Sequence, residues 1–241
     1  MATYDEIRKK TSALAAKLSS ATGIAKSTVM NIIMYAKCLQ CPTKPDVIED
    51  LVFLAQMGLR FGITSRYHLQ LMLEATRPPR SQYIHLEDYV KVICIFLCSD
   101  LDVRINFVFE VYNFTNSGFI QIQDITQLLK NSIHTMSDED ANEQLKEMIE
   151  MLVSVIDSNA DNLLSLEEFR AFVKKNILCL ELFGKILPDP AILKSFRFIM
   201  ENKAPSKIRD YFQHERTRCL GEPETKEKDN ALYPGVVLDL I

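Results

Sequence analysis

Residues 157–168 read DSNADNLLSLEE, with oxygen-bearing side chains at the first, third, fifth, ninth and twelfth places. Calcium takes six to eight oxygen ligands, and a twelve-residue loop between two helices supplies them from these places and from the seventh backbone carbonyl. The predicted metal ligands are therefore Asp157, Asn159, Asp161, Leu163, Ser165 and Glu168. The sixth place usually holds glycine and here holds Asn162, which tolerates a left-handed backbone well. The stretch predicts one calcium site.

Apolar residues recur at helical spacing on both sides of this loop. Before it they are Met148, Ile149, Leu152, Val153 and Ile156, and after it Phe169, Phe172 and Val173. Spacings of three and four residues put them on one face of a helix, which predicts a helix–loop–helix unit. Met148 and Met151 are expected in the core, with a groove for a partner helix as the alternative.

A second loop of the same outline spans residues 113–124, NFTNSGFIQIQD. Its ligand places hold Asn113, Thr115, Ser117, Gln121 and Asp124, so it has a single carboxylate where calcium sites have several. Gly118 still suits the turn, and Ile120 stands at the eighth place, as Leu164 does in the first loop. We expect this loop to be empty and to brace its neighbour through an antiparallel bridge between Ile120 and Leu164.

A third stretch, RPPRSQYIHLED at residues 77–88, stands where another loop is expected. Arg77 and Arg80 place positive charge at the ion position and Pro79 distorts the loop, so we predict that it is empty as well. Ahead of it, the pattern indicates a helix over residues 21–40 capped at Ser27, a break at CPTKP, and helices over residues 46–61 and 65–75.

These units predict an all-α fold of EF-hand helix–loop–helix pairs in two lobes, with short antiparallel bridges between paired loops. Residues 1–100 are expected to form an N-terminal lobe with degenerate EF-hands, and residues 101–185 a C-terminal EF-hand pair. A helix over residues 186–203 and an extended tail over residues 204–241 complete the expected organisation. Between the last two loops, Ser137 is expected to cap a helix.

The composition and charge argue against several classes of partner and activity. The net charge of −4 predicts neither a nucleic-acid nor a membrane partner, and the apolar run of residues 89–98 is too short to span a bilayer. Six dispersed cysteines favour a reducing cytosolic compartment. Cys38 and Cys41 form a CxxC with no second ligand pair, so half-buried thiols are expected there in preference to zinc. The sequence lacks a phosphate-binding loop and its four histidines are scattered, which argues against an enzyme.

The sequence resembles the calaxin-like group of EF-hand proteins, which are related to the neuronal calcium sensors. Three runs carry the resemblance: FVFEVYNFTNSGFIQIQDITQLLKNS from Phe107, SVIDSNADNLLSLEEFRAFV from Ser154, and LELFGKILPDP from Leu180. It covers roughly residues 45–190. The resemblance implies a protein of the axoneme in motile cilia and sperm flagella, bound to the outer dynein arm docking complex, dynein or tubulin doublet proteins. The sequence departs from the group because two of its three loops lack good ligands.

Two functions follow. The first is a non-enzymatic axonemal adaptor that holds at most one calcium ion and binds its partners through helix grooves. The second is a soluble calcium-sensing regulatory subunit of an enzyme, similar to calcineurin B or the neuronal sensors. The two hypotheses differ in whether calcium opens the protein and exposes apolar surface.

Overall fold

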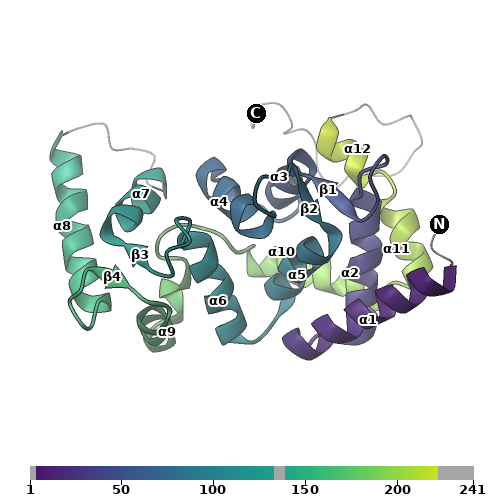
Figure 1. Cartoon of the computed structure of the whole chain (residues 1–241), viewed down its shortest axis with the longest axis horizontal. Coiled ribbons are helices and arrows are strands. Elements are labelled where there is room, and N and C mark those ends of the chain that lie inside the picture. Colours follow the sequence, from purple (N-terminus) through teal and green to yellow (C-terminus); the bar gives the residue numbers. More distant parts are fainter. Residues whose placement is uncertain (1–3, 133–138, 222–241) are drawn as a thin grey trace. The chain divides into compact units, whose positions relative to one another are not determined.

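The computed structural model describes residues 4–132 and 139–221, which are predominantly helical (Figure 1). Contacts divide the chain into two compact units. Unit 1 comprises residues 1–62, 76–97 and 189–241, and unit 2 comprises residues 63–75 and 98–188. The predicted all-α fold is confirmed, and the strands among the described residues are confined to two short antiparallel pairs.

Unit 1 contains the helices α1 (Tyr4–Thr22), α2 (Lys26–Leu39), α3 (Asp50–Leu59) and α5 (Leu86–Leu97). Strands β1 (Val47–Glu49) and β2 (Tyr83–His85) pair antiparallel, with Ile48 opposite Ile84. Since Ile84 is the eighth residue of the loop 77–88, Ile48 is the eighth residue of a further loop over residues 41–52. Unit 1 thus holds one more loop than the sequence pattern predicted.

Two local predictions for this region are wrong. The helix expected over residues 46–61 begins only at Asp50, because residues 47–49 form β1 and pair with β2. Ser27 lies inside α2, whose N-cap is Ala25 with no side-chain cap. The tertiary pairing with β2 outweighs the helical pattern in the first case. The predicted cap at Ser137 lies outside the described residues.

The C-terminal segment returns to unit 1. Helices α10 (Pro190–Asn202), α11 (Pro205–Phe212) and α12 (Glu215–Leu220) pack on α2, α3 and α5. The extended tail predicted from residue 204 is therefore wrong as far as residue 220. The physical reason is the burial of apolar side chains, since Ile208 and Phe212 are buried in unit 1.

An aromatic cluster anchors these C-terminal helices. The Tyr35 ring of α2 lies edge-on to Phe196 and Phe212, with centroids 5.3 and 4.6 Å away. Asn31 donates from Nδ2 to the carbonyls of Met200 (2.8 Å) and Lys203 (2.9 Å), and so satisfies the end of α10. These buried contacts make α10–α12 part of the core of unit 1.

Unit 2 contains the EF-hand pair of the C-terminal half. Its helices are α4 (Arg66–Thr76), α6 (Leu101–Tyr112), α7 (Ile122–Ser132), α8 (Glu139–Ile156), α9 (Leu166–Lys175) and the 3-10 helix η1 (Ile177–Glu181). Strand β3 (Ile120–Gln121) pairs with β4 (Leu163–Leu164). Phe169 and Phe183 stack at 6.3 Å in its core, and Tyr112 donates its hydroxyl to the Gly184 carbonyl at 2.7 Å.

Two methionines of α8 lie outside this core. Met148 and Met151 are 44 and 71% exposed. They were expected in the core, and this prediction is wrong because Leu145, Ile149 and Ile156 occupy the buried face of the helix.

The predicted lobe boundaries divide the chain differently from these units. Residues 63–75, expected in an N-terminal lobe of residues 1–100, group with unit 2, and residues 189–220 group with unit 1. The buried apolar faces of α10–α12, more than their place in the chain, decide that second assignment.

Candidate metal centre

The loops at residues 113–124 and 157–168 share one backbone form. Ala160 and Asn162 have φ of 58° and 63°, and the fourth and sixth residues of the other loop, Asn116 and Gly118, have 54° and 85°. Four left-handed residues at equivalent places turn the two chains in the same way. The expected bridge is confirmed, because Ile120 lies directly opposite Leu164.

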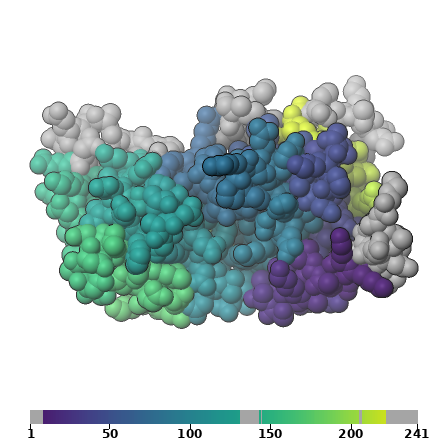
Figure 2. All heavy atoms as spheres, viewed as in Figure 1, coloured from purple at the N-terminus to yellow at the C-terminus, as the bar shows by residue number. Residues whose placement is uncertain are grey.

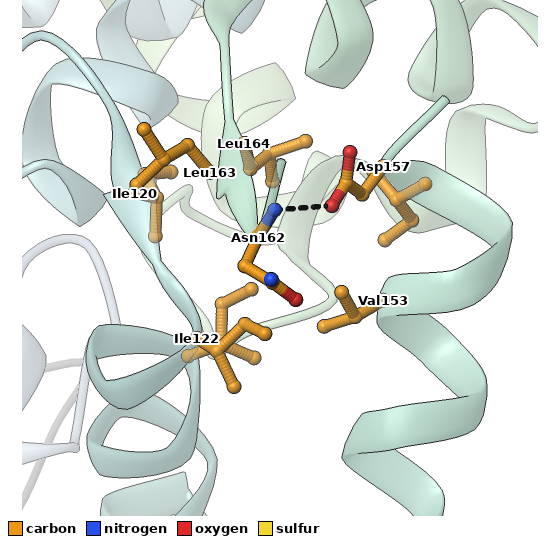
Figure 3. A pocket seen from close by; sticks show the side chains of 9 residues that line it. Ile120, Ile122, Val153, Asp157, Asn162, Leu163 and Leu164 are labelled. Carbon is orange, nitrogen blue, oxygen red and sulfur yellow. Dashed lines mark hydrogen bonds between the residues drawn. The ribbon is translucent and has the colours of Figure 1, made fainter. Parts of the chain in front are cut away.

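Asp157 lies at the end of α8, at the first place of its loop. The residue is 9% exposed, and its Oδ2 accepts a hydrogen bond from the Asn162 backbone N–H at 2.8 Å (Figure 3). Its Oδ1 is buried without a hydrogen-bond partner among the described residues. A buried, unpaired carboxylate oxygen is costly unless a cation or water meets it, so Asp157 fits a metal ligand.

Asn159 and Asp161 are brought together by the turn. Asn159 donates from Nδ2 to Asp161 Oδ2 at 2.9 Å, and the Asp161 N–H donates to Asn159 Oδ1 at 3.0 Å. Asp161 Oδ1 also accepts from the Leu163 N–H at 2.8 Å. Leu163 itself belongs to β4 and pairs with Gln121, which fixes the backbone from which its carbonyl would act.

Ser165 and Glu168 form a reciprocal cap at the start of α9. The Ser165 N–H and hydroxyl donate to Glu168 Oε2 at 3.0 and 2.7 Å, while the Ser165 Oγ accepts from the Glu168 N–H. Ser158 donates its N–H and hydroxyl to Oε1 at 3.0 and 2.9 Å. Desolvation of the carboxyl opposes ionisation, but these hydrogen bonds outweigh it and lower the pKa of Glu168 to about 2.

The structure brings the predicted ligands together in pairs. Asn159 lies with Asp161 and Ser165 with Glu168, whereas Asp157 bonds to the Asn162 backbone. Across residues 4–132 and 139–221, no three His, Cys, Asp or Glu side chains gather closely enough to hold a metal ion. The carboxylate, amide, hydroxyl and carbonyl oxygens of the loop nevertheless suit a hard cation. Asp157 Oδ1, which has no hydrogen-bond partner among the described residues, is the oxygen that such a cation would meet.

Apolar side chains fill the space beneath the two loops. Ile120 and Ile122 face Val153, Leu163 and Leu164 around a very small cavity that also reaches Asp157 and Asn162 (Figure 3). This packing ties the end of α8 to β3 and β4. The loop at residues 113–124 therefore supports the loop at residues 157–168 through apolar contacts as well as through the bridge.

The loop at residues 113–124 satisfies its polar groups internally. Ser117 donates to the Phe119 carbonyl at 2.7 Å and Thr115 donates to Ser117 at 3.2 Å. Asp124, at the twelfth place, is buried and its Oδ2 accepts from the Gln121 N–H at 3.1 Å. These contacts agree with a structural role, while the expectation that the loop is empty stays a prediction.

In the loop at residues 77–88, Arg77 forms an ion pair with Asp50. Asp50 begins α3, directly after β1, so a fixed guanidinium bonds across the paired loops of unit 1. This charge stands at the first ligand place and opposes a divalent cation there. The expectation that this loop is empty also stays a prediction.

The additional loop at residues 41–52 has little metal chemistry. Its first place is Cys41 and its twelfth is Val52, so both anchoring carboxylates are missing. Asp46 takes φ of 58° at the sixth place and its carbonyl accepts from the Leu86 N–H at 3.0 Å. The feature of the sequence that could have revealed this loop was Ile48, which stands four residues before Val52, as Ile84 stands four before Asp88.

The two cysteines of the CxxC are free thiols, of which Cys38 is half-buried and Cys41 is buried.

Comparison with known proteins adds family evidence. Residues 102–174 match the family described as the EF-hand domain pair. Calaxin from Xenopus laevis is 27% identical over 177 residues, which are 71% of this chain and 85% of that protein. Human calaxin is 28% identical over 135 residues, 56% of this chain and 64% of that protein, so the match spans less than two thirds of its length.

A further relative has a different name and a lower identity. Guanylyl cyclase-activating protein 1 from Gallus gallus is 25% identical over 156 residues, 64% of this chain and 77% of that protein. None of the helices in the described part of the chain has the length and apolar character needed to cross a membrane. The matched pair and the paired loops show that residues 102–174 form an EF-hand domain pair, and over much of its length the chain is similar to the calaxins.

Proposed function

We propose that the protein is a non-enzymatic axonemal adaptor of motile cilia or sperm flagella, which binds one calcium ion at residues 157–168 and assists outer dynein arm docking. The buried Asp157 oxygen without a partner is the observation that supports the ion site. The similarity to calaxins supports the ciliary part. Its partners would be the docking complex, dynein or tubulin doublet proteins.

The two loops of unit 2 would have different roles, one binding the ion and the other supporting it. Asp157 and Glu168 would supply the charge at the two ends of the ion loop, and the lowered pKa of Glu168 keeps its carboxylate ionised well into the acidic range. The loop at residues 113–124 holds β3 in place and needs no ion for its own hydrogen bonds. Calcium, when bound, supplies a hard cation that joins oxygens from both ends of its loop.

Calorimetric titration with calcium tests the site. We expect one binding event in the full chain, its loss in Glu168→Gln, and little change in Asn113→Ala, the matched first-place control in the other loop. An absence of binding heat in the wild type would refute a single site. Binding that survives Glu168→Gln would place the ion elsewhere.

Sedimentation with doublet microtubules carrying purified docking complex tests the adaptor part. We expect the full chain to sediment with them and to remain soluble alone. A protein that stays in the supernatant at micromolar concentration would contradict the adaptor, whatever calorimetry finds.

A regulatory subunit of an enzyme is the second candidate, favoured by the similarity to guanylyl cyclase-activating protein 1. A sensor of that kind should expose apolar surface when calcium binds. A large calcium-dependent rise in the fluorescence of an apolar dye would favour it, and an unchanged signal would favour the adaptor.

A further inference from the structure

Helices α1 and α11, which are far apart in the sequence, both contact the last turn of α2 in unit 1 (Figure 1). Lys37 of α2 donates from Nζ to Thr11 Oγ1 of α1 at 3.4 Å. At the next residue of α2, the Cys38 thiol lies 4.0 Å from the Arg209 carbonyl of α11. Burial raises the pKa of this thiol, and the positive charge of Arg209 is close enough to oppose that effect. The two contacts bring cationic residues from three helices to one corner.

Four side chains give this corner its positive charge, and we name Lys9, Lys10, Lys37 and Arg209 the basic corner. Lys9, Lys10 and Arg209 are exposed, and Lys37 is half-buried. Lys9 and Lys10 directly precede Thr11, so they lie within one helical turn of the contact with Lys37. Atoms of α1, drawn in purple, form part of the visible surface of unit 1 (Figure 2). The charges of the basic corner are therefore accessible from outside.

The ion pairs of unit 1 do not neutralise this charge. They join Glu49 to Arg216, Asp50 to Arg77, Glu87 to Lys17, and Glu215 to Arg60. Within the described part of the chain, none of the four cations of the basic corner forms an ion pair. In the sequence, residues 5–10 and 207–210 add Arg8 and Lys207 to these four and hold three acidic residues, so positive charge is in excess. Like charges at one corner repel each other unless an anion meets them.

We propose that the basic corner binds an acidic segment of a partner protein, with aspartate or glutamate side chains beside Lys10, Lys37 and Arg209. Arginine can form two parallel hydrogen bonds to a carboxylate, and lysine supplies a point charge on a flexible stem. Because Lys37 is already held on Thr11, less side-chain freedom is lost when a carboxylate binds there. The proposal goes beyond the proposed function, since it requires neither calcium nor a particular assembly.

Nucleic acids and anionic membranes fit this surface less well than an acidic protein segment. Single-stranded nucleic-acid sites add aromatic side chains that stack on bases, and membrane-surface helices add large apolar ones. Among the described residues, no large exposed apolar side chain lies on α1 or α2, and Tyr211 of α11 is covered by Lys203, whose Nζ lies 4.5 Å from the ring centroid. The net charge of −4 also opposes attraction to a long polyanion. Residues 222–241 of this chain hold five acidic residues and two lysines, so their removal is one part of the test.

Fluorescence anisotropy with a labelled peptide of glutamate and glycine tests the proposal in the presence of a calcium chelator. We expect the full chain to bind it with micromolar affinity at low ionic strength and more weakly as salt is added, because the charges are exposed. Lys10→Gln, Lys37→Gln and Arg209→Gln should each weaken binding about threefold, and the three together at least tenfold. A peptide with lysine in place of glutamate should not bind.

Lys17→Gln is the matched control, because it removes the same charge from α1 at a lysine that already pairs with Glu87. Its affinity should stay within twofold of wild type, and circular dichroism should show all variants folded. Unchanged affinity in the triple variant, or an equal loss in Lys17→Gln, would overturn the proposal. So would tighter binding of a single-stranded oligonucleotide or of phosphatidylserine vesicles than of the glutamate peptide. A marked gain in affinity on deletion of residues 222–241 would also overturn it, since that would identify this segment as the occupant.

Discussion

Replacing Gly118 by valine should destabilise unit 2 through the backbone alone. Gly118 has φ of 85°, and a Cβ built on it meets no atom within 4 Å, so space does not limit the substitution. An L-residue in the left-handed region costs ~1–2 kcal/mol, and a β-branched residue costs more. We therefore expect losses of about 0.5 kcal/mol for Gly118→Asn, about 1.5 for Gly118→Ala and about 2.5 for Gly118→Val.

Urea unfolding of the full chain measures these losses, and the order of the three variants is the decisive result. Backbone strain ranks asparagine as the mildest change, because it adopts the left-handed region more readily than alanine. Side-chain size would instead rank alanine as the mildest. Equal losses for asparagine and valine, or a ranking by volume, would refute the argument from the turn.

The Gly118 variants should also change calcium affinity at the neighbouring loop, residues 157–168. Gly118 precedes β3, which pairs with β4 and so positions Leu163. If valine loosens β3 to relieve its strain, calcium affinity at residues 157–168 should fall ~tenfold, which corresponds to about 1.4 kcal/mol. Calorimetry on Gly118→Asn, with affinity close to wild type, is the control.

Three further outcomes are expected. Because the pKa of Glu168 is about 2 in the folded protein and ~4.3 when unfolded, its stabilisation is complete above pH ~5 and is lost as pH falls toward 2. Acid unfolding of Glu168→Gln, followed by circular dichroism, should lack that part of the pH dependence. Glu215→Gln, which leaves the Arg60 guanidinium half-buried without its ionic partner, should cost about 3 kcal/mol in urea unfolding, against little for Lys17→Gln at an exposed pair. Arg77→Ala, which removes the partner of Asp50, should lower stability by about 1–2 kcal/mol without adding a calcium site by calorimetry.

Local patterns predicted much of unit 2. The ligand spacing, the left-handed Asn162 and Gly118, and the Ile120–Leu164 pairing all involve residues within one loop or at equivalent places of two loops. Their conformations follow from short-range sterics and from backbone hydrogen bonds, which the residue types themselves limit. The sequence pattern did not predict how the ligand oxygens are arranged. Glu168 accepts hydrogen bonds from Ser158 and Ser165, while Asp157 accepts one from the Asn162 backbone.

The loop at residues 41–52, which the sequence pattern did not predict, shows the limit of such local patterns. Residues 47–49 belong to the stretch whose apolar spacing predicts a helix, and pairing with the strand β2, which lies more than thirty residues later, makes them extended. Ser27 was predicted as a cap from its residue type, whereas α2 already begins at Lys26. Long-range pairing outweighs a local preference whose free energy is only a few tenths of a kcal/mol per residue.

By itself, the sequence determined that the chain is helical, that the loops at residues 113–124 and 157–168 pair, and that one of these two loops carries calcium-type oxygens, since each of these depends on residues within one loop or at equivalent places of two loops. Only the tertiary structure decided which apolar faces meet. It packs α10–α12 into unit 1 through Phe196 and Phe212, and it leaves Met151 and Val155 on the surface of α8. The hydrophobic effect is non-directional, so an apolar residue needs burial without specifying its partner, and the partner follows from the packing of the whole unit.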